Sequence, residues 1–98
     1  MDITRIGASG LIAAGQAVAV RANNVVNAQT PQFRPLAPVF SPINSGGGVA
    51  LFTQRVDQQV NVLRESVGFM AAAQQYKAAA NIMRRSEELA GAFLRAIG

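Results

Sequence analysis

The chain contains no cysteine, no histidine and no tryptophan. Without Cys and His it can form neither disulfide bonds nor zinc sites built on the usual ligands, and it has no imidazole for acid/base catalysis. No pair of carboxylates shares a helix face, and no activated nucleophile is evident. We therefore predict that the protein is not an enzyme and that it uses no cofactor, metal ion or small-molecule substrate.

Acidic residues are also scarce, since nine Lys and Arg stand against five Asp and Glu in 98 residues. The basic residues are scattered along the chain, which is typical of a solvated face, so no nucleic-acid partner is expected. The apolar segment GLIAAGQAVAV is too short to span a membrane. Asp2, Gln16 and the many Gly and Ala residues argue against a signal peptide, so we interpret this segment as mature sequence.

The N-terminal segment, residues 3–28, has apolar residues at steps of three and four, which predicts a helix. The sequence up to Thr30, followed by Pro31, should end it. Three Asn residues, at 23, 24 and 27, lie close to that end. Because the Asn amide competes for backbone groups, such a cluster marks either a helix end or a surface that forms hydrogen bonds.

The middle segment is rich in turn-forming residues. Proline at 35, 38 and 42 suits an extended edge strand, because proline has no backbone N–H to donate. The sequence NSGGG at 44–48 predicts a turn, and residues 49–55 predict a returning strand with Val49, Leu51 and Thr53 on one face. We expect a two-stranded hairpin, which is marginally stable unless it packs on another element.

Residues 57–97 predict a long helix with Asp57 as its N-cap. Two stripes of apolar residues with heptad-like steps run along it, the first at 56, 60, 63, 67 and 70 and the second at 69, 73, 76, 80, 83, 87, 90, 94 and 97. The predicted seam consists of Leu63, Val67, Met70, Tyr76, Met83, Leu94 and Ile97, paired with Leu11, Val18 and Val25. Glu87 falls on the second stripe, where a charge can select a partner. Arg84 and Arg85 are spaced to form surface pairs with Glu88.

The predicted helices differ in length, at about 60 Å and about 39 Å. The fold class we predict is mainly α, with long N- and C-terminal helices pairing as an antiparallel coiled-coil-like hairpin around a short extended or β-hairpin segment. Roughly 20 Å of apolar seam is then left without cover from its own chain, a surface that monomers rarely expose. An assembly subunit is therefore favoured over a free globule.

Two terminal motifs resemble the bacterial flagellar rod and hook family. SGLIAAGQAVAVRANNVVNAQTPQFRP resembles its N-terminal signature through Ser9, Gly10, Leu11, Asn23, Asn24, Asn27, Thr30, Pro31, Phe33 and Arg34. The C-terminal segment from Val56 resembles the closing helix of the family, with Glu65, Tyr76, Ala78 and Ala79 at matching places. Gln32 departs from the pattern, because the family has Gly there, which adopts positive φ more readily.

The resemblance implies a short rod-type axial protein of the flagellar basal body. Residues 1–30 would be the N-terminal helix with the family motif, residues 31–55 the extended segment, and residues 56–98 the long C-terminal helix, together forming one structural unit. It implies assembly with other copies and with other rod and hook proteins. It also implies export by the flagellar type III apparatus without a cleaved signal peptide, and a location spanning the periplasm.

Two other interpretations stay open. The chain could be a basic amphipathic helical protein that binds a membrane surface or nucleic acid, in which case binding should weaken steeply with salt. It could also be a secreted helical adaptor that loses its first twenty residues, which the mass of the mature protein would test.

Overall fold

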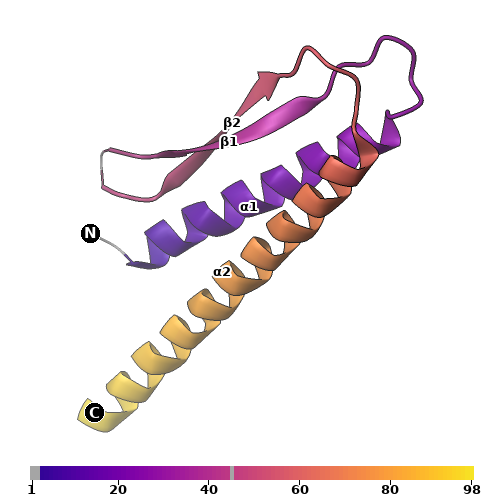
Figure 1. The fold of residues 1–98 in the computed structure, drawn as a ribbon. Helices are drawn as coiled ribbons and strands as arrows, with labels where there is room; N and C mark the ends of the chain where they lie inside the picture. The colour runs from indigo at the N-terminus through magenta and orange to yellow at the C-terminus, as the bar shows by residue number, and fades with distance from the viewer. Residues whose placement is uncertain (1–2, 45) are drawn as a thin grey trace.

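The computed structural model describes residues 3–44 and 46–98. Helix α1 spans Ile3–Val26, strands β1 and β2 span Leu36–Pro42 and Val49–Arg55, and helix α2 spans Val62–Ile97 (Figure 1). The molecule is elongated, with extents of 62 × 25 × 14 Å and a radius of gyration of 17.1 Å. A compact chain of this length would have a radius of gyration of about 13 Å. The predicted order of helix, hairpin and helix is confirmed.

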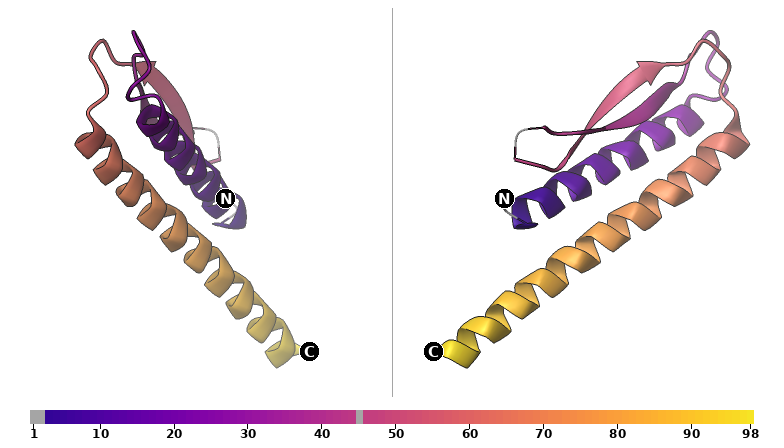
Figure 2. Two further views of the ribbon diagram at one scale, coloured as in Figure 1. Left: turned by 90° about the vertical axis from the view of Figure 1, so that its right-hand side faces the viewer. Right: turned by 60° about the vertical axis from the view of Figure 1, so that its left-hand side comes forward.

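Helix α1 is the middle layer of the structure. The hairpin packs against one side of α1 and α2 against another, and the hairpin does not contact α2 within the described elements (Figures 1 and 2). The buried apolar side chains of the described residues are alanines at 13, 14, 17 and 72, together with Pro35. Since an alanine buries little area, the core between these layers is thin.

The two helices run in opposite directions, and small residues of α1 receive larger side chains of α2. A Cβ placed on Gly7 would lie 3.2 Å from Cγ of Met83, and one on Gly15 would lie 3.4 Å from Cε2 of Tyr76. The helix axes are closest near the loops and diverge towards the chain termini (Figure 2). The glycines that lower the helix propensity of α1 thus provide room for α2.

The hairpin is antiparallel, with Leu36 opposite Arg55 and Pro42 opposite Val49. Its turn contains three glycines with positive φ, at 46, 47 and 48, as a turn of this kind requires. The backbone of Leu36 faces away from β2, because it bonds to Asn24 instead. Pro38 and Pro42 follow at even spacing on that same free edge, where a missing N–H costs no ladder bond.

Two predicted helix boundaries are corrected. Helix α2 begins at Val62, and its N-cap is Asn61, whose Oδ1 accepts from the N–H of Arg64 at 3.1 Å. Asp57, the predicted cap, lies in the loop and pairs with Arg34 at 3.6 Å. Helix α1 ends at Val26, two residues before the predicted end. The positions 56 and 60 of the first predicted stripe therefore lie outside α2.

Candidate functional site: the α2 seam and the hairpin anchors

The side of α2 that faces α1 begins at Glu65. Its buried or half-buried positions advance by threes and fours along the helix, at residues 65, 69, 72, 79, 83 and 86. Tyr76 belongs to the same line and packs beside Gly15 and Val18. The second predicted stripe therefore faces α1 from Phe69 to Met83. Its Ala73 and Ala80 are half-buried at the border of that face.

Leu63 and Val67 were predicted to pack against the first helix, but they do not, since they are 76% and 58% exposed. Each lies two residues from Glu65, which is about 200° around the helix. Met70 is mostly exposed as well, but it lines the edge of an apolar groove between the helices together with Val25 and Phe69. The prediction that these three residues pair with the first helix is therefore wrong for Leu63 and Val67, and holds only at the groove edge for Met70.

Beyond Met83, the described residues of α1 leave most of the seam of α2 uncovered. Helix α2 has 36 residues and α1 has 24, so α2 is longer by about 18 Å. Leu94 and Ile97 continue the spacing of the seam, yet they are 64% and 66% exposed. Glu87 is exposed in the same segment, residues 84–97, which we call the α2 overhang.

Ser9 fastens the turn end of the hairpin to α1. Its Oγ donates to the carbonyl of Ile6 at 2.7 Å and accepts from the N–H of Val49 at 3.0 Å. Arg5 donates to the carbonyl of Gly46 at 2.6 Å, which adds a second bond at the same end. The family-like residue Ser9 thus has a structural role in this chain.

Asn24 fastens the other end of the hairpin, and it is fully buried. Its Oδ1 accepts from the N–H of Leu36 at 3.1 Å, and its Nδ2 donates to the carbonyl of Leu36 at 2.8 Å. The Nδ2 group also donates to Oε2 of Glu65 at 2.9 Å. One side chain therefore joins α1, β1 and α2.

The carboxylate of Glu65 is held between Asn24 and Arg21. Nη1 of Arg21 lies 3.2 Å and 3.1 Å from the two carboxylate oxygens, and Glu65 is 5% exposed. The guanidinium crosses over Gly68, where a Cβ would lie 2.6 Å from Nε of Arg21. A buried carboxylate requires such partners, because an unpaired buried charge is costly.

The roles of Arg21, Glu65 and Gly68 were not predicted from the sequence. One signal was available: Gly68 interrupts an otherwise strong helix three residues after an acid. That spacing places the glycine on the same side of the helix as the carboxylate, where a cation from a neighbouring helix needs room.

The two anchors fit the length of the hairpin. Ser9 and Asn24 are 15 residues apart, which is about 22 Å along a helix and close to a whole number of turns, so both lie on one side of α1. The seven residues of β1 span about 20 Å. The hairpin is therefore held at both ends along α1.

The other motif residues form the end of α1. Nδ2 of Asn27 donates to the carbonyl of Asn23 at 2.9 Å, and Oδ1 of Asn27 accepts from Thr30 at 3.1 Å. Phe33 is half-buried and its N–H donates to the carbonyl of Thr30 at 3.2 Å, across exposed Pro31. Gln32 has a φ of 64°, so it adopts the left-handed conformation that Gly takes most readily.

Gly10 and Leu11 complete the motif. A Cβ on Gly10 would meet no atom of the described residues within 4 Å, so nothing in this part of the chain requires a glycine there. Leu11 is half-buried.

The described residues contain no group of three or more potential metal ligands among Asp and Glu, and none of their helices is long and apolar enough to cross a membrane. The predicted pairs of Arg84 and Arg85 with Glu88 are not formed in this part of the chain, where Arg84 instead donates to Oδ1 of Asn81 at 2.9 Å. Neither models of known protein families nor curated protein sequences match the chain.

Proposed function

We propose that the protein is a structural, self-assembling subunit of the bacterial flagellar basal-body rod, without enzymatic activity. One observation carries this proposal: the apolar seam of α2 runs about 18 Å past the end of α1. Apolar seams of this kind are usually covered by a partner. The proposed partners are other copies of the chain and other axial proteins of the rod and hook.

The resemblance to axial proteins supports this proposal at specific residues. Ser9 and Asn24, which belong to the N-terminal motif, are the residues that fix the hairpin along α1. In the assembled state, we expect α1 and α2 to pair as an antiparallel coiled coil, with Tyr76 and Met83 in the seam. The chain would reach the periplasm through the flagellar type III apparatus without a cleaved signal peptide.

The thin core suggests how assembly and folding are coupled. The buried apolar side chains of the described residues are four alanines and Pro35, so the isolated chain has little burial to offset its conformational entropy. We expect a partly disordered monomer whose helicity rises as subunits assemble. A cooperative and fully helical monomer at micromolar concentration, measured by circular dichroism, would contradict this expectation.

The test is light scattering and electron microscopy on the purified, untagged protein over a concentration series. We expect rods or rings, with helicity rising as they form. The double variant Leu94→Glu/Ile97→Glu should prevent assembly, because it places two charges on the seam of the α2 overhang. The control, Gln58→Glu/Gln59→Glu, adds the same charge to an exposed loop and should still assemble. Assembly of the seam variant at the wild-type concentration would refute the proposal.

A further inference from the structure

Helix α2 has a second apolar surface on the side turned away from α1. Its large side chains are 58% to 76% exposed, and we call this surface the outer stripe: Leu63, Val67, Met70, Ile82 and Leu89. At 100° per residue, these positions fall within about 120° of one another and opposite the seam. The hairpin does not contact α2, so no described element of the chain covers this stripe except at Met70, which borders the groove beside Val25 of α1.

Basic residues border the outer stripe. Lys77, Arg84 and Arg95 are separated by 7 and 11 residues, spacings that return to the same side of a helix. All three are exposed, and the ion pairs of the described chain, Arg21 with Glu65 and Arg34 with Asp57, do not include them. Glu88 is the one acid along this border.

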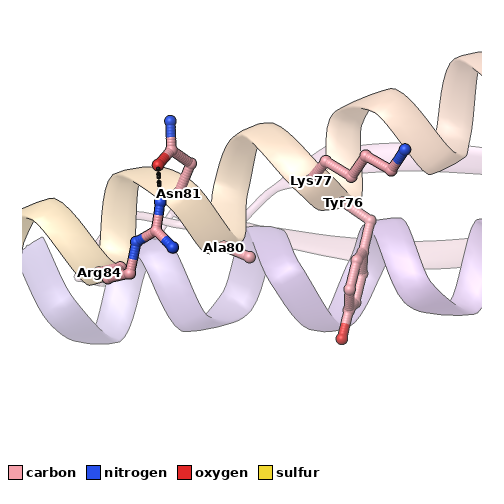
Figure 3. A pocket seen from close by; sticks show the side chains of 5 residues that line it. All are labelled: Tyr76, Lys77, Ala80, Asn81 and Arg84. Atoms are coloured by element: carbon pink, nitrogen blue, oxygen red, sulfur yellow. Dashed lines mark hydrogen bonds between the residues drawn. The ribbon is translucent and has the colours of Figure 1, made fainter.

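A shallow hollow lies within the basic border (Figure 3). It is lined by Tyr76, Lys77, Ala80, Asn81 and Arg84. Arg84 is oriented by its hydrogen bond to Asn81, two helical turns from the ammonium of Lys77. The two residues lie seven positions, about 10 Å, apart along α2, so a partner could place one carboxylate near each cation.

We propose that the outer stripe of α2 is a docking surface for an amphipathic helix of a different protein, one whose polar border carries Asp and Glu. Apolar side chains would fill the stripe, and the acids would face Lys77, Arg84 and Arg95. This surface is separate from the seam of the α2 overhang, so this inference and the proposed self-assembly can fail independently.

Charge argues against a second copy of this chain as the occupant. The exposed acids of the described residues are Asp57, Glu87 and Glu88, and Asp57 is already paired with Arg34. Two outer stripes facing each other would bring their basic borders together with few acids between them. Like charges at such a contact oppose association.

The pattern also argues against a lipid surface. Gln74 and Arg85 lie within the outer stripe, between its apolar residues. An interfacial helix sinks its apolar face into the acyl boundary, where both groups would lose water without gaining partners. A seam between two helices tolerates isolated polar residues, which then select the register and the partner.

The test uses two synthetic helical peptides of about four heptads, with Leu at the seam positions and either Glu or Lys at the flanking positions. Fluorescence anisotropy would measure their binding to the full-length protein at low and moderate salt. We expect the Glu peptide to bind at least about 10-fold more tightly than the Lys peptide, with affinity falling as salt rises. Equal binding of the two peptides, or no binding of the Glu peptide, would overturn the proposal.

Variants locate the site. Lys77→Glu/Arg84→Glu and, separately, Val67→Ser/Ile82→Ser should each weaken binding of the Glu peptide by about 10-fold or more. All four side chains are exposed, so the helicity of the protein should be unchanged. Gln58→Glu/Gln59→Glu should bind as the wild type does. If this control weakens binding as much as Lys77→Glu/Arg84→Glu, the attraction is nonspecific and the proposal fails.

Two further measurements address the other occupants. Vesicles of phosphatidylcholine with phosphatidylglycerol should not compete with the Glu peptide. If the wild type binds these vesicles strongly and Val67→Ser/Ile82→Ser does not, the stripe binds a membrane and the proposal is wrong. Self-assembly should survive Lys77→Glu/Arg84→Glu but not Leu94→Glu/Ile97→Glu. If Val67→Ser/Ile82→Ser abolishes self-assembly, the stripe belongs to a second copy and the inference is wrong.

Discussion

The part of α2 opposite α1 and the α2 overhang use different kinds of side chain. Opposite α1, from Glu65 to Met83, the contact is made largely by alanines, by glycines of α1 and by one buried polar cluster. In the overhang, residues 84–97, the seam carries Leu94 and Ile97, which stay exposed. The chain thus buries small residues within itself and leaves large apolar ones on its surface.

This difference separates specificity from burial. Within the chain, Asn24 and Glu65 fix which residues of α1 and α2 face each other, although the contact buries little apolar area. A buried polar pair contributes little net stability, but removal of one partner is costly, so it selects one register. The overhang instead exposes apolar surface and has no buried polar cluster like that of Asn24 and Glu65. Such a surface would suit the contacts proposed to form during assembly.

The largest expected effect comes from Asn24→Ala, which would break the polar cluster. It leaves the half-buried N–H and carbonyl of Leu36, and the buried Glu65 carboxylate, each short of a hydrogen bond. At about 1–3 kcal/mol for each unsatisfied group, we expect a loss of roughly 3 kcal/mol in the free energy of unfolding. Urea denaturation followed by circular dichroism would measure it, with wild type and variant compared at one protein concentration at which the wild type is helical.

Asn23→Ala is the matched control, because Asn23 is adjacent, exposed and not part of the cluster. We expect its free energy of unfolding to stay within about 0.5 kcal/mol of the wild type. Equal losses in the two variants would show that the cluster does not set the register of the helices.

A smaller effect is expected where α2 packs on a glycine of α1. Gly15→Leu would force a side chain into the ring of Tyr76, 3.4 Å from the position of the new Cβ. We expect a loss of about 1–2 kcal/mol from overpacking. Gly10→Leu is the control in the same helix, since its Cβ would meet open space, and it should raise helicity because Leu favours a helix over Gly.

Assembly would sharpen this second comparison. If Gly10→Leu forms a more helical monomer that no longer assembles, Gly10 faces a neighbouring subunit. If Gly15→Leu is as stable as Gly10→Leu, the packing of Tyr76 on α1 contributes nothing to stability. The part of α2 opposite α1 would then be no more firmly packed than the overhang.

The order of the elements could be predicted from the sequence because strong local signals marked it. Pro31 ended the region of α1, the prolines fixed an edge strand, and three glycines fixed the hairpin turn. The start of α2 could not be predicted in this way. Asp57 and Asn61 are both good N-caps, and tertiary contacts decide between them: the N–H of Val56 donates to the carbonyl of Pro35 at 2.9 Å, which extends the hairpin.

The seam was harder to predict because α2 is apolar on two sides. Leu63 and Val67 have the spacing and hydrophobicity of seam residues, but they belong to the outer stripe. The actual seam begins with the acidic Glu65 and includes Ala72 and Ala79 beside Phe69, Tyr76 and Met83, and a hydrophobic pattern weighs the acid and the alanines too little. The acid and the alanines are buried or half-buried because α1 packs against them. The periodicity of α2 alone does not show which of its two apolar sides α1 will cover.

The smallest expected effect concerns Gln32, at the end of the molecule where the helices are held together. Its φ of 64° costs a non-glycine residue about 1–2 kcal/mol, whereas glycine adds about 0.5–1 kcal/mol of conformational entropy to the unfolded chain. Gln32→Gly should therefore stabilise the protein by about 0.5–1 kcal/mol, measured as a higher urea midpoint. Gln29→Gly lies in the same turn without a positive φ and should destabilise it slightly. Destabilisation by Gln32→Gly would mean that the Gln32 side chain makes a contact that offsets the cost of its positive φ. The backbone conformation at Gln32 would then not limit the stability of this end of the molecule, where the two helices are closest.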